Sequence, residues 1–243
     1  MKSFGMTDVG KKRKVNQDYL FYSDEPVGCF PNLYIVADGM GGHNAGDKAS
    51  SLAVTRFVEL ARKQDRELPF LTMERIISQV NQEVHRVSVQ EEQYAGMGTT
   101  FVAATVIDRE AYIMNIGDSR LYYYNGSLEQ VTLDHSLVEE LVRAGELNPE
   151  ESRNHPQKNI ITRAIGVGEN LVPDFFRKKM DRDSYLLLCS DGLSNMVDDE
   201  SLFDILNAGG TEEEITEKCV EEALFYGGID NIAVVVARQD DGR

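Results

Sequence analysis

Five aspartates stand where apolar, strand-like segments begin or end, and they are the residues of this sequence best suited to chemistry. They are Asp18, Asp38, Asp118, Asp191 and Asp230. One aspartate at such a position is a common turn former. Five carboxylates that converged at one edge of packed sheets would repel one another unless cations neutralised them. Because the ligand atoms would all be oxygen, the pattern favours Mg²⁺ or Mn²⁺ over Zn²⁺.

The segment ADGMGGH (37–43) admits two interpretations, a phosphate-binding loop or a metal site. A GxxxxGK[ST] phosphate loop is excluded because Asp47 occupies the lysine position. A GxGxxG dinucleotide loop is excluded because Asn44 stands where the third glycine belongs. The metal interpretation lacks no residue, since Asp38 supplies a carboxylate and Gly39 lets a backbone carbonyl approach an ion without a Cβ in the way.

The composition predicts a folded, acidic protein. The chain has 243 residues, of which 42% are hydrophobic, enough for a substantial core in one large domain or two small ones. The 41 acidic and 25 basic residues give a net charge of −16, so a basic nucleic-acid-binding face is not expected. The acidity is compatible with solvated acidic helices, notably over 198–222, and equally with a carboxylate-lined cation site.

The cysteines and the N-terminus favour a cytoplasmic protein. Cys29, Cys189 and Cys219 are widely spaced and form no CxxC pair, as expected in a reducing compartment. The first residues, MKSFGMTDVGKKRK, lack the apolar core of a signal peptide, and no run approaches the ~20 apolar residues of a membrane span. We therefore expect a cytoplasmic monomer with no nucleic-acid or membrane partner, unless the chain is part of a longer protein.

Seven segments are apolar and rich in β-branched or aromatic residues, which predicts strands. They are 18–22, 32–37, 99–107, 111–116, 120–124, 184–190 and 231–237. Two of them, 99–107 and 231–237, lack polar alternation and so predict strands buried on both faces. Asn125–Gly126 predicts a hairpin after 120–124, and 108–110 is expected to join two more strands.

Four segments show helical periodicity or helix-start signals. They are 45–60, 72–89, the segment LVEELVRAG after Ser136 and the segment EITEKCVEEAL after Thr211. Ser136 with Glu139 fits a capping box, in which each side chain bonds to the backbone of the other residue. Thr211 with Glu214 fits the same pattern.

The order of these elements favours antiparallel sheets, because most strands follow one another through short turns. Sheets that are buried on both faces need covering layers. Two sheets packed together with helices outside, an α+β arrangement, satisfy both requirements. The segment 143–170 is polar and weakly patterned, and we expect it to be a flap-like surface insertion beside the site.

Eight short motifs follow one another along nearly the whole chain. They are TDVGKKRKVNQD (7–18), VADGMGGHNAG (36–46), MGTT (97–100), NIGDSRLY (115–122), VTLDHS (131–136), ITRAIG (161–166), CSDGL (189–193) and DNIAVVV (230–236). In these motifs the chain resembles the metal-dependent protein serine/threonine phosphatases of type 2C, the PPM family, in their compact bacterial form. Each motif alone is weak, but eight in the family's order are highly specific.

The resemblance implies a single domain over 1–243, folded as a four-layer α-β-β-α sandwich, and a binuclear Mg²⁺ or Mn²⁺ centre. It implies the following ligands: Asp38 bridging the two metals, the carbonyl of Gly39, Asp191 and Asp230 completing the shell, and Asp18 close by. Asp118 and Asp191 match the positions that hold a third, weaker metal in bacterial relatives. Asp118 is almost equally compatible with a hairpin cap.

Arg13 matches the residue that grips the substrate phosphate in the family, although its run KKRK alone is typical of a solvated basic turn. Animal enzymes of the family carry a histidine directly after the Asp-Gly pair. Here Met40 stands there and His43 follows three residues later, so the resemblance assigns no general-acid role to His43. Four polar neighbours are expected to support the ligands rather than touch substrate. They are Asn16, Thr99, Thr100 and Asn231.

The implied activity is hydrolysis of phosphoserine and phosphothreonine in proteins by a metal-activated water, without a phosphoenzyme. The implied partners are phosphoprotein substrates, including a cognate serine/threonine kinase whose action the protein opposes. Three alternatives stay open: a phosphatase dedicated to one regulatory partner, a small-molecule phosphoesterase, and a catalytically dead binding module. The intact set of Asp38, Asp191 and Asp230 argues against the dead module.

Overall fold

Two antiparallel β-sheets pack face to face in the computed structural model, which describes residues 1–41, 45–65, 68–148, 151 and 155–239. The first sheet has the order β1 (Lys2–Asp8), β11 (Ile232–Arg238), β10 (Tyr185–Cys189), β7 (Arg120–Tyr124) and β8 (Leu128–Gln130). The second has the order β2 (Asp18–Ser23), β3 (Leu33–Met40), β5 (Phe101–Ile107), β6 (Glu110–Ile116) and β9 (Asp174–Lys179), and β4 (Gly98–Thr99) pairs with β3.

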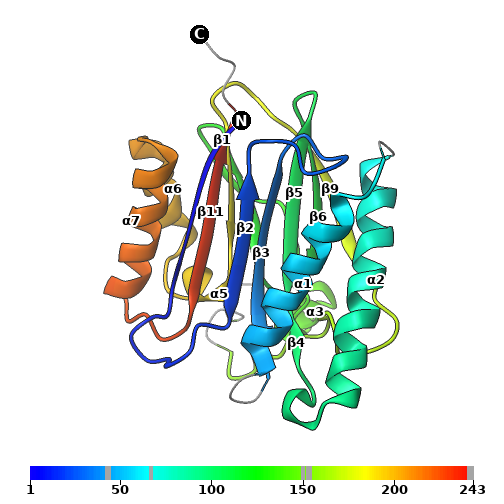
Figure 1. The fold of residues 1–243 in the computed structure, drawn as a ribbon. Coiled ribbons are helices and arrows are strands. Elements are labelled where there is room, and N and C mark those ends of the chain that lie inside the picture. Colours follow the sequence, from blue (N-terminus) through cyan, green and yellow to red (C-terminus); the bar gives the residue numbers. More distant parts are fainter. Residues whose placement is uncertain (42–44, 66–67, 149–150, 152–154, 240–243) are drawn as a thin grey trace.

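Helices cover both outer faces of the sheets (Figure 1). The second sheet carries α1 (Ala45–Ala61) and α2 (Pro69–Gln90), and the first carries α5 (Asp191–Ser194), α6 (Asp199–Ala208) and α7 (Glu212–Phe225). The short η1 (Glu92–Tyr94) follows α2, and α3 (Leu137–Arg143) follows β8. These four layers confirm the α-β-β-α sandwich predicted from the sequence. No described helix is long and apolar enough to cross a bilayer.

Three apolar clusters hold the layers together. The first fills the space between the two sheets, the second lies under α1 and α2, and the third lies under α6 and α7. Strand β11 contributes to two of them, because Val235 faces the other sheet and Val236 faces the helices. Both valines are fully buried. The lack of polar alternation over 231–237 therefore predicted its two-sided burial correctly.

The seven predicted strand segments and the four predicted helices are all present. Strands β1 and β9 were not predicted, and both are edge strands with one hydrogen-bonded neighbour. The loop between β5 and β6 is a two-residue turn in which Asp108 and Arg109 have φ of 49° and 63°. These values match the I′ geometry that suits the twist of a hairpin. That 143–170 forms a flap stays a prediction.

Of the two predicted capping boxes, one is complete. At α7 the Thr211 hydroxyl accepts from the Glu214 N–H, and the Glu214 carboxylate accepts from the Thr211 N–H. At α3 the Ser136 hydroxyl accepts from the Glu139 N–H at 3.3 Å, but the Ser136 N–H does not donate back to the Glu139 carboxylate. The capping box predicted at Ser136 is thus only half correct, and the Glu139 carboxylate does not bond to the helix N-terminus.

Because both faces of β11 are buried, Val235→Ala and Val236→Ala should each lower the free energy of unfolding by about 2 kcal/mol. Val89→Ala on α2 is the matched control, since Val89 is 70% exposed and its truncation should change stability by less than about 0.5 kcal/mol. Urea unfolding of the three variants measures the difference. A Val235 or Val236 variant as stable as the Val89 variant would contradict the two-sided packing of β11.

Candidate metal centre

The five predicted aspartates converge at one end of the two sheets; together they are called the aspartate cluster below. Asp18 opens β2 and lies directly opposite Asp38 in the β2–β3 ladder. Asp230 comes just before β11, and Asp191 begins α5 just after β10, the antiparallel neighbour of β11. Asp118 follows β6 and lies close enough for its charge to act on Asp38.

The side chains in the cluster contact one another. Asp38 lies within hydrogen-bonding reach of both Asp18 and Asp191. The charges of Asp191 and Asp230 act on Asp18, and that of Asp191 also acts on Asp118. Asp18 and Asp118 are buried, and the other three are half-buried. The structure therefore brings together all five carboxylates that the sequence singled out.

Burial and like charge make the ionised forms of these groups unfavourable. Burial, reinforced by the charges of Asp191 and Asp230, raises the pKa of Asp18 to about 8, although the Ser190 hydroxyl opposes the shift. Burial and neighbouring carboxylates likewise raise the pKa of Asp38, of Asp118 and of Asp191. A bound cation would reverse this balance, because it favours the ionised carboxylate.

The free oxygens of the cluster fit a hard cation. One buried oxygen each of Asp18, Asp118 and Asp191 has no N–H or hydroxyl donor among the described residues. An unpaired buried oxygen is costly and suits a metal ligand. No three Asp, Glu, His or Cys side chains in the described part of the chain surround one point closely enough to hold an ion alone. Mg²⁺ does not require that, because it binds through one or two carboxylates and keeps several waters.

Hydroxyl and amide groups position the carboxylates. Thr100 Oγ1 accepts from the Asp38 N–H at 2.8 Å, and Thr99 Oγ1 donates to the Asp38 carbonyl at 2.9 Å. Asn16 Oδ1 accepts from the Asp18 N–H at 3.1 Å. The expectation that Asn16, Thr99 and Thr100 support the ligands agrees with these contacts.

Two supporting residues were missed by the sequence analysis. Ser190 Oγ donates to Asp18 Oδ2 at 2.6 Å, and Asn195 Nδ2 donates to Asp191 Oδ2 at 2.9 Å. The signal for Asn195 is its spacing, four residues after Asp191 at the start of a helix. Ser190 gave no such signal, because its partner lies 172 residues away in sequence.

Close backbone packing requires a glycine at position 39, whether or not a metal binds there. A Cβ at this position would lie 2.0 Å from the Gly46 carbonyl oxygen and 2.6 Å from the Gln17 carbonyl oxygen. The end of β3 therefore packs directly on the first turn of α1, closer than any side chain permits. A role for the Gly39 carbonyl as a metal ligand stays a prediction. His43, with the rest of 42–44, lies outside the described residues.

Arg13 reaches the cluster from the loop between β1 and β2. Its Nη2 donates to Asp230 Oδ2 at 2.7 Å, and its side chain is 50% exposed. One nitrogen of the guanidinium therefore contacts the cluster, and its exposed part can bind another anion. Lys158 approaches the cluster from elsewhere, because its charge and that of Arg13 both lower the pKa of Asp191 against the stronger effect of burial.

Asn231 fixes the loop that carries Arg13. Its Nδ2 donates to the carbonyls of Val9 and Val15 at 2.9 and 3.0 Å. Its Oδ1 accepts from the Gln17 N–H at 2.9 Å. One buried amide thus holds both ends of the 9–17 loop next to Asp230, as expected for a residue that orients the site rather than binds substrate.

The likenesses to known proteins span nearly the whole chain. A family model described as Protein phosphatase 2C matches residues 10–218. Protein phosphatase PhpP of Streptococcus pneumoniae serotype 2 is 41% identical over 246 residues, covering 97% of this chain and 96% of that protein. Serine/threonine phosphatase stp of Listeria monocytogenes serotype 4b is 42% identical over 247 residues, covering 96% and 94%. The crystal structure of the catalytic domain of the phosphatase PstP in complex with 2 manganese ions has a TM-score of 0.87 at 31% identity, covering 99% of this chain and 98% of that chain.

The raised pKa of Asp18 predicts how metal-stripped protein responds to pH. The stability that Asp18 contributes is fully present below its ordinary pKa of 3.8 and is lost as the pH rises through about 8. Metal-stripped protein should therefore melt at a lower temperature at about pH 8 than at about pH 5. Asp18→Asn should make the melting temperature depend less on pH, and it should raise the melting temperature at the higher pH.

Asp204→Asn, at an exposed position of α6, is the charge-matched control and should leave the slope unchanged. Thermal unfolding followed by circular dichroism across this pH range measures both variants. An Asp18→Asn protein with the same slope as the Asp204→Asn protein would show that Asp18 is ionised throughout and that its neighbours do not disfavour its charge.

Proposed function

We propose, from the premise that this chain belongs to the protein phosphatase 2C family and is a protein serine/threonine phosphatase, that it hydrolyses phosphoserine and phosphothreonine by a metal-dependent reaction at the aspartate cluster. The observation that carries the proposal is the convergence of five buried and half-buried carboxylates, of which Asp18, Asp118 and Asp191 have raised pKa values and unpaired buried oxygens. Two divalent cations, when bound there, would supply a water activated at neutral pH and would offset charge on the phosphate.

The residues proposed to hold these cations are those of the family match. Asp38 and the Gly39 carbonyl, with Asp191 and Asp230, hold the two Mg²⁺ or Mn²⁺ ions, and Asp18 lies close by. Asp118 together with Asp191 holds a third, weaker ion. The PstP structure, whose title names two manganese ions, supports the metal class. The all-oxygen ligand set supports hard cations independently.

Arg13 is proposed to bind the substrate phosphate. Its guanidinium is half-exposed while one nitrogen is bonded to Asp230, so it can present further N–H groups to phosphate oxygens. Because Asn231 holds the loop, little conformational freedom is lost when the phosphate binds. Arg13 would stabilise negative charge on the phosphate oxygens in the ground state and in the transition state.

A covalent cysteine mechanism has no support in the site. Cys189 is fully buried two residues before Asp191, and burial raises the pKa of its thiol. A neutral buried thiol is a poor nucleophile. Direct attack by water therefore agrees best with the residues present. The carboxylates are held in place during the reaction by hydrogen bonds that join Asn195, Ser190 and Thr100 to Asp191, Asp18 and Asp38, respectively.

The partners of this chain are proposed to be phosphoproteins, among them a cognate serine/threonine kinase whose action it opposes. The kinase, the monomeric state and the cytoplasmic location are expectations from the sequence. A phosphatase dedicated to one regulatory partner would use the same site, and a panel of phosphopeptides separates that case from broad activity. Activity on small phosphate esters alone would favour the small-molecule alternative.

Metal removal is the first test. Protein treated with EDTA should lose activity on para-nitrophenyl phosphate and on phosphopeptides, and Mn²⁺ or Mg²⁺ should restore it. Asp38→Asn should reduce kcat by orders of magnitude with the fold retained, since it removes one charge at nearly constant volume. Asp204→Asn serves as the control. Full activity in EDTA would exclude the metal-dependent mechanism, and an unfolded Asp38→Asn protein would make that carboxylate structural.

The second test concerns Arg13. Arg13→Ala should raise KM by roughly tenfold to a hundredfold, the size expected for a charge-assisted hydrogen bond. Arg13→Lys should recover part of the loss, because an ammonium cannot form the guanidinium fork. Lys12→Ala and Lys14→Ala should have small effects that fade with salt. Because Arg13 is bonded to Asp230, activity is also measured against Mn²⁺ concentration for each variant. A changed Mn²⁺ requirement would indicate that the substitution acts through Asp230 rather than on the phosphate. Equal effects at Arg13, Lys12 and Lys14 would remove Arg13 from the site.

A further inference from the structure

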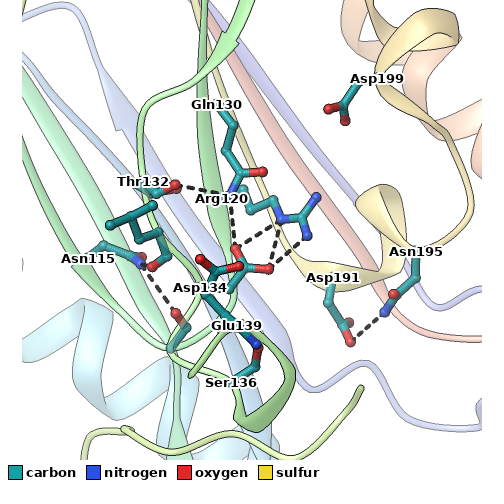
Figure 2. Close-up of polar contacts among 12 residues, drawn as sticks. Asn115, Arg120, Gln130, Thr132, Asp134, Ser136, Glu139, Asp191, Asn195 and Asp199 are labelled. Carbon is teal, nitrogen blue, oxygen red and sulfur yellow. Dashed lines mark hydrogen bonds and ion pairs between the residues drawn. The ribbon is translucent and has the colours of Figure 1, made fainter. Parts of the chain in front are cut away.

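A cavity of about 350 Å³ opens beside the aspartate cluster and shares Asp118 and Asp191 with it. Asp134, Glu139 and Asp199 also line it. Figure 2 shows Asp134 and Glu139 on one side of this space and Asp191 and Asp199 on the other. Because consecutive Cα atoms are about 3.8 Å apart, a side chain near a phosphorylated residue reaches this cavity while the phosphate lies at the cluster.

One wall of the cavity is a rigid ion pair. Arg120 Nε and Nη2 donate to the two carboxylate oxygens of Asp134 at 2.7 to 3.1 Å (Figure 2), and Nη1 donates to the Tyr122 hydroxyl at 2.9 Å. Gln130 Nε2 donates to Asp134 at 3.0 Å. Since all three guanidinium nitrogens are engaged, Arg120 is not available for an anion. This wall therefore adds shape without net charge.

The Glu139 carboxylate forms no hydrogen bond or ion pair with another described residue. Its side chain does not complete the capping box at Ser136, whereas Glu214 does so at Thr211. It is half-buried, and burial and the charge of Asp134 raise its pKa against the opposing charges of Arg143 and Arg120. A cation beside Glu139 would relieve that unfavourable charge.

A second carboxylate of the lining also points to a cationic ligand. On the far wall, Asp199 accepts a hydrogen bond from the Tyr122 hydroxyl at 3.3 Å and otherwise faces the cavity. Lys158 also lines the cavity, but its charge acts on Asp191. Arg120 is paired with Asp134, so Glu139 and Asp199 are the lining carboxylates outside the aspartate cluster that form no ion pair with a described lining residue. Arg143 acts on Glu139 from the same helix without lining the cavity.

We propose that this cavity binds a basic side chain, lysine or arginine, within two residues of the phosphoserine or phosphothreonine of the substrate. The proposal rests on the proposed function of the aspartate cluster and narrows its substrate class. Glu139 is the specificity-determining residue, and Asp199 is the second carboxylate facing the bound cation. The net charge of −16 adds long-range attraction for basic segments.

Other occupants agree less well with the lining. An acidic side chain would meet Glu139 and Asp199, and the arginine in the wall is already paired. A third metal ion held by Asp118 and Asp191 would sit at carboxylates that are not among the groups whose charges act on Glu139, which are Asp134, Arg143 and Arg120. A lysine or arginine side chain is long enough to pair with Glu139 without displacing the ions proposed at the aspartate cluster.

The test uses three phosphopeptides that differ only at positions flanking the phosphorylated residue, where they carry arginine, glutamine or glutamate. With Mn²⁺-loaded full chain, kcat/KM should be about fivefold higher for the arginine peptide than for the glutamine peptide, the size of one partly buried ion pair, and lowest for the glutamate peptide. High salt should shrink the preference. Glu139→Gln should bring the arginine-to-glutamine ratio close to unity.

Glu140→Gln is the matched control, because Glu140 is the exposed neighbour on the same helix and does not line the cavity. It should keep the wild-type ratio. Equal rates of wild-type protein on all three peptides would overturn the inference and leave the proposed function standing, whereas failure on every peptide and on para-nitrophenyl phosphate would overturn the proposed function itself. A Glu139→Gln protein that needs more Mn²⁺ equally for all peptides would make the cavity a metal site and refute the basic-side-chain assignment.

Discussion

Repulsion among buried carboxylates is the constraint on which the rest of this structure depends. Asp18 and Asp38 face each other across the β2–β3 ladder, and Asp191 reaches them from the first residue of α5. Each charge disfavours the next, and burial removes the water that would screen them. Such a cluster persists only because the surrounding fold is stable enough to hold it. Two sheets buried on both faces supply that stability from core contacts remote from the site.

The groups around the cluster limit movement rather than neutralise charge. Thr100 and Ser190 hold the aspartates through short hydrogen bonds, and Asn231 holds the loop before β2. Most of these contacts join segments from different sheets or from distant parts of the chain. These hydrogen bonds therefore position the proposed metal ligands through contacts within the protein itself. A site of this kind trades stability for function.

Charges of opposite sign lie on two different sides of the aspartate cluster. Arg13 stands on the side of Asp230, and the uncommitted Glu139 stands in the cavity beyond Asp118. A phosphorylated segment that is basic next to its phosphate would match both regions at once, with its phosphate toward the guanidinium and its cation toward the carboxylate. This charge asymmetry arises within a protein of strongly negative net charge, in which Arg13 and Lys158 are cations that act on Asp191 of the cluster.

The sequence by itself determined the central strands and the identity of the clustered carboxylates. The lack of polar alternation over 231–237 predicted a strand buried on both faces, and aspartates at strand ends predicted convergence. Strands β1 and β9 escaped prediction because an edge strand has one neighbour and a mixed, partly exposed composition. The partners of Ser190 and Glu139 were decided only by the tertiary structure. Local pattern cannot specify which distant group a hydroxyl reaches, or whether a capping glutamate turns to its helix or to a cavity, because that choice depends on charges such as Asp134 and Arg120 that the fold brings beside it.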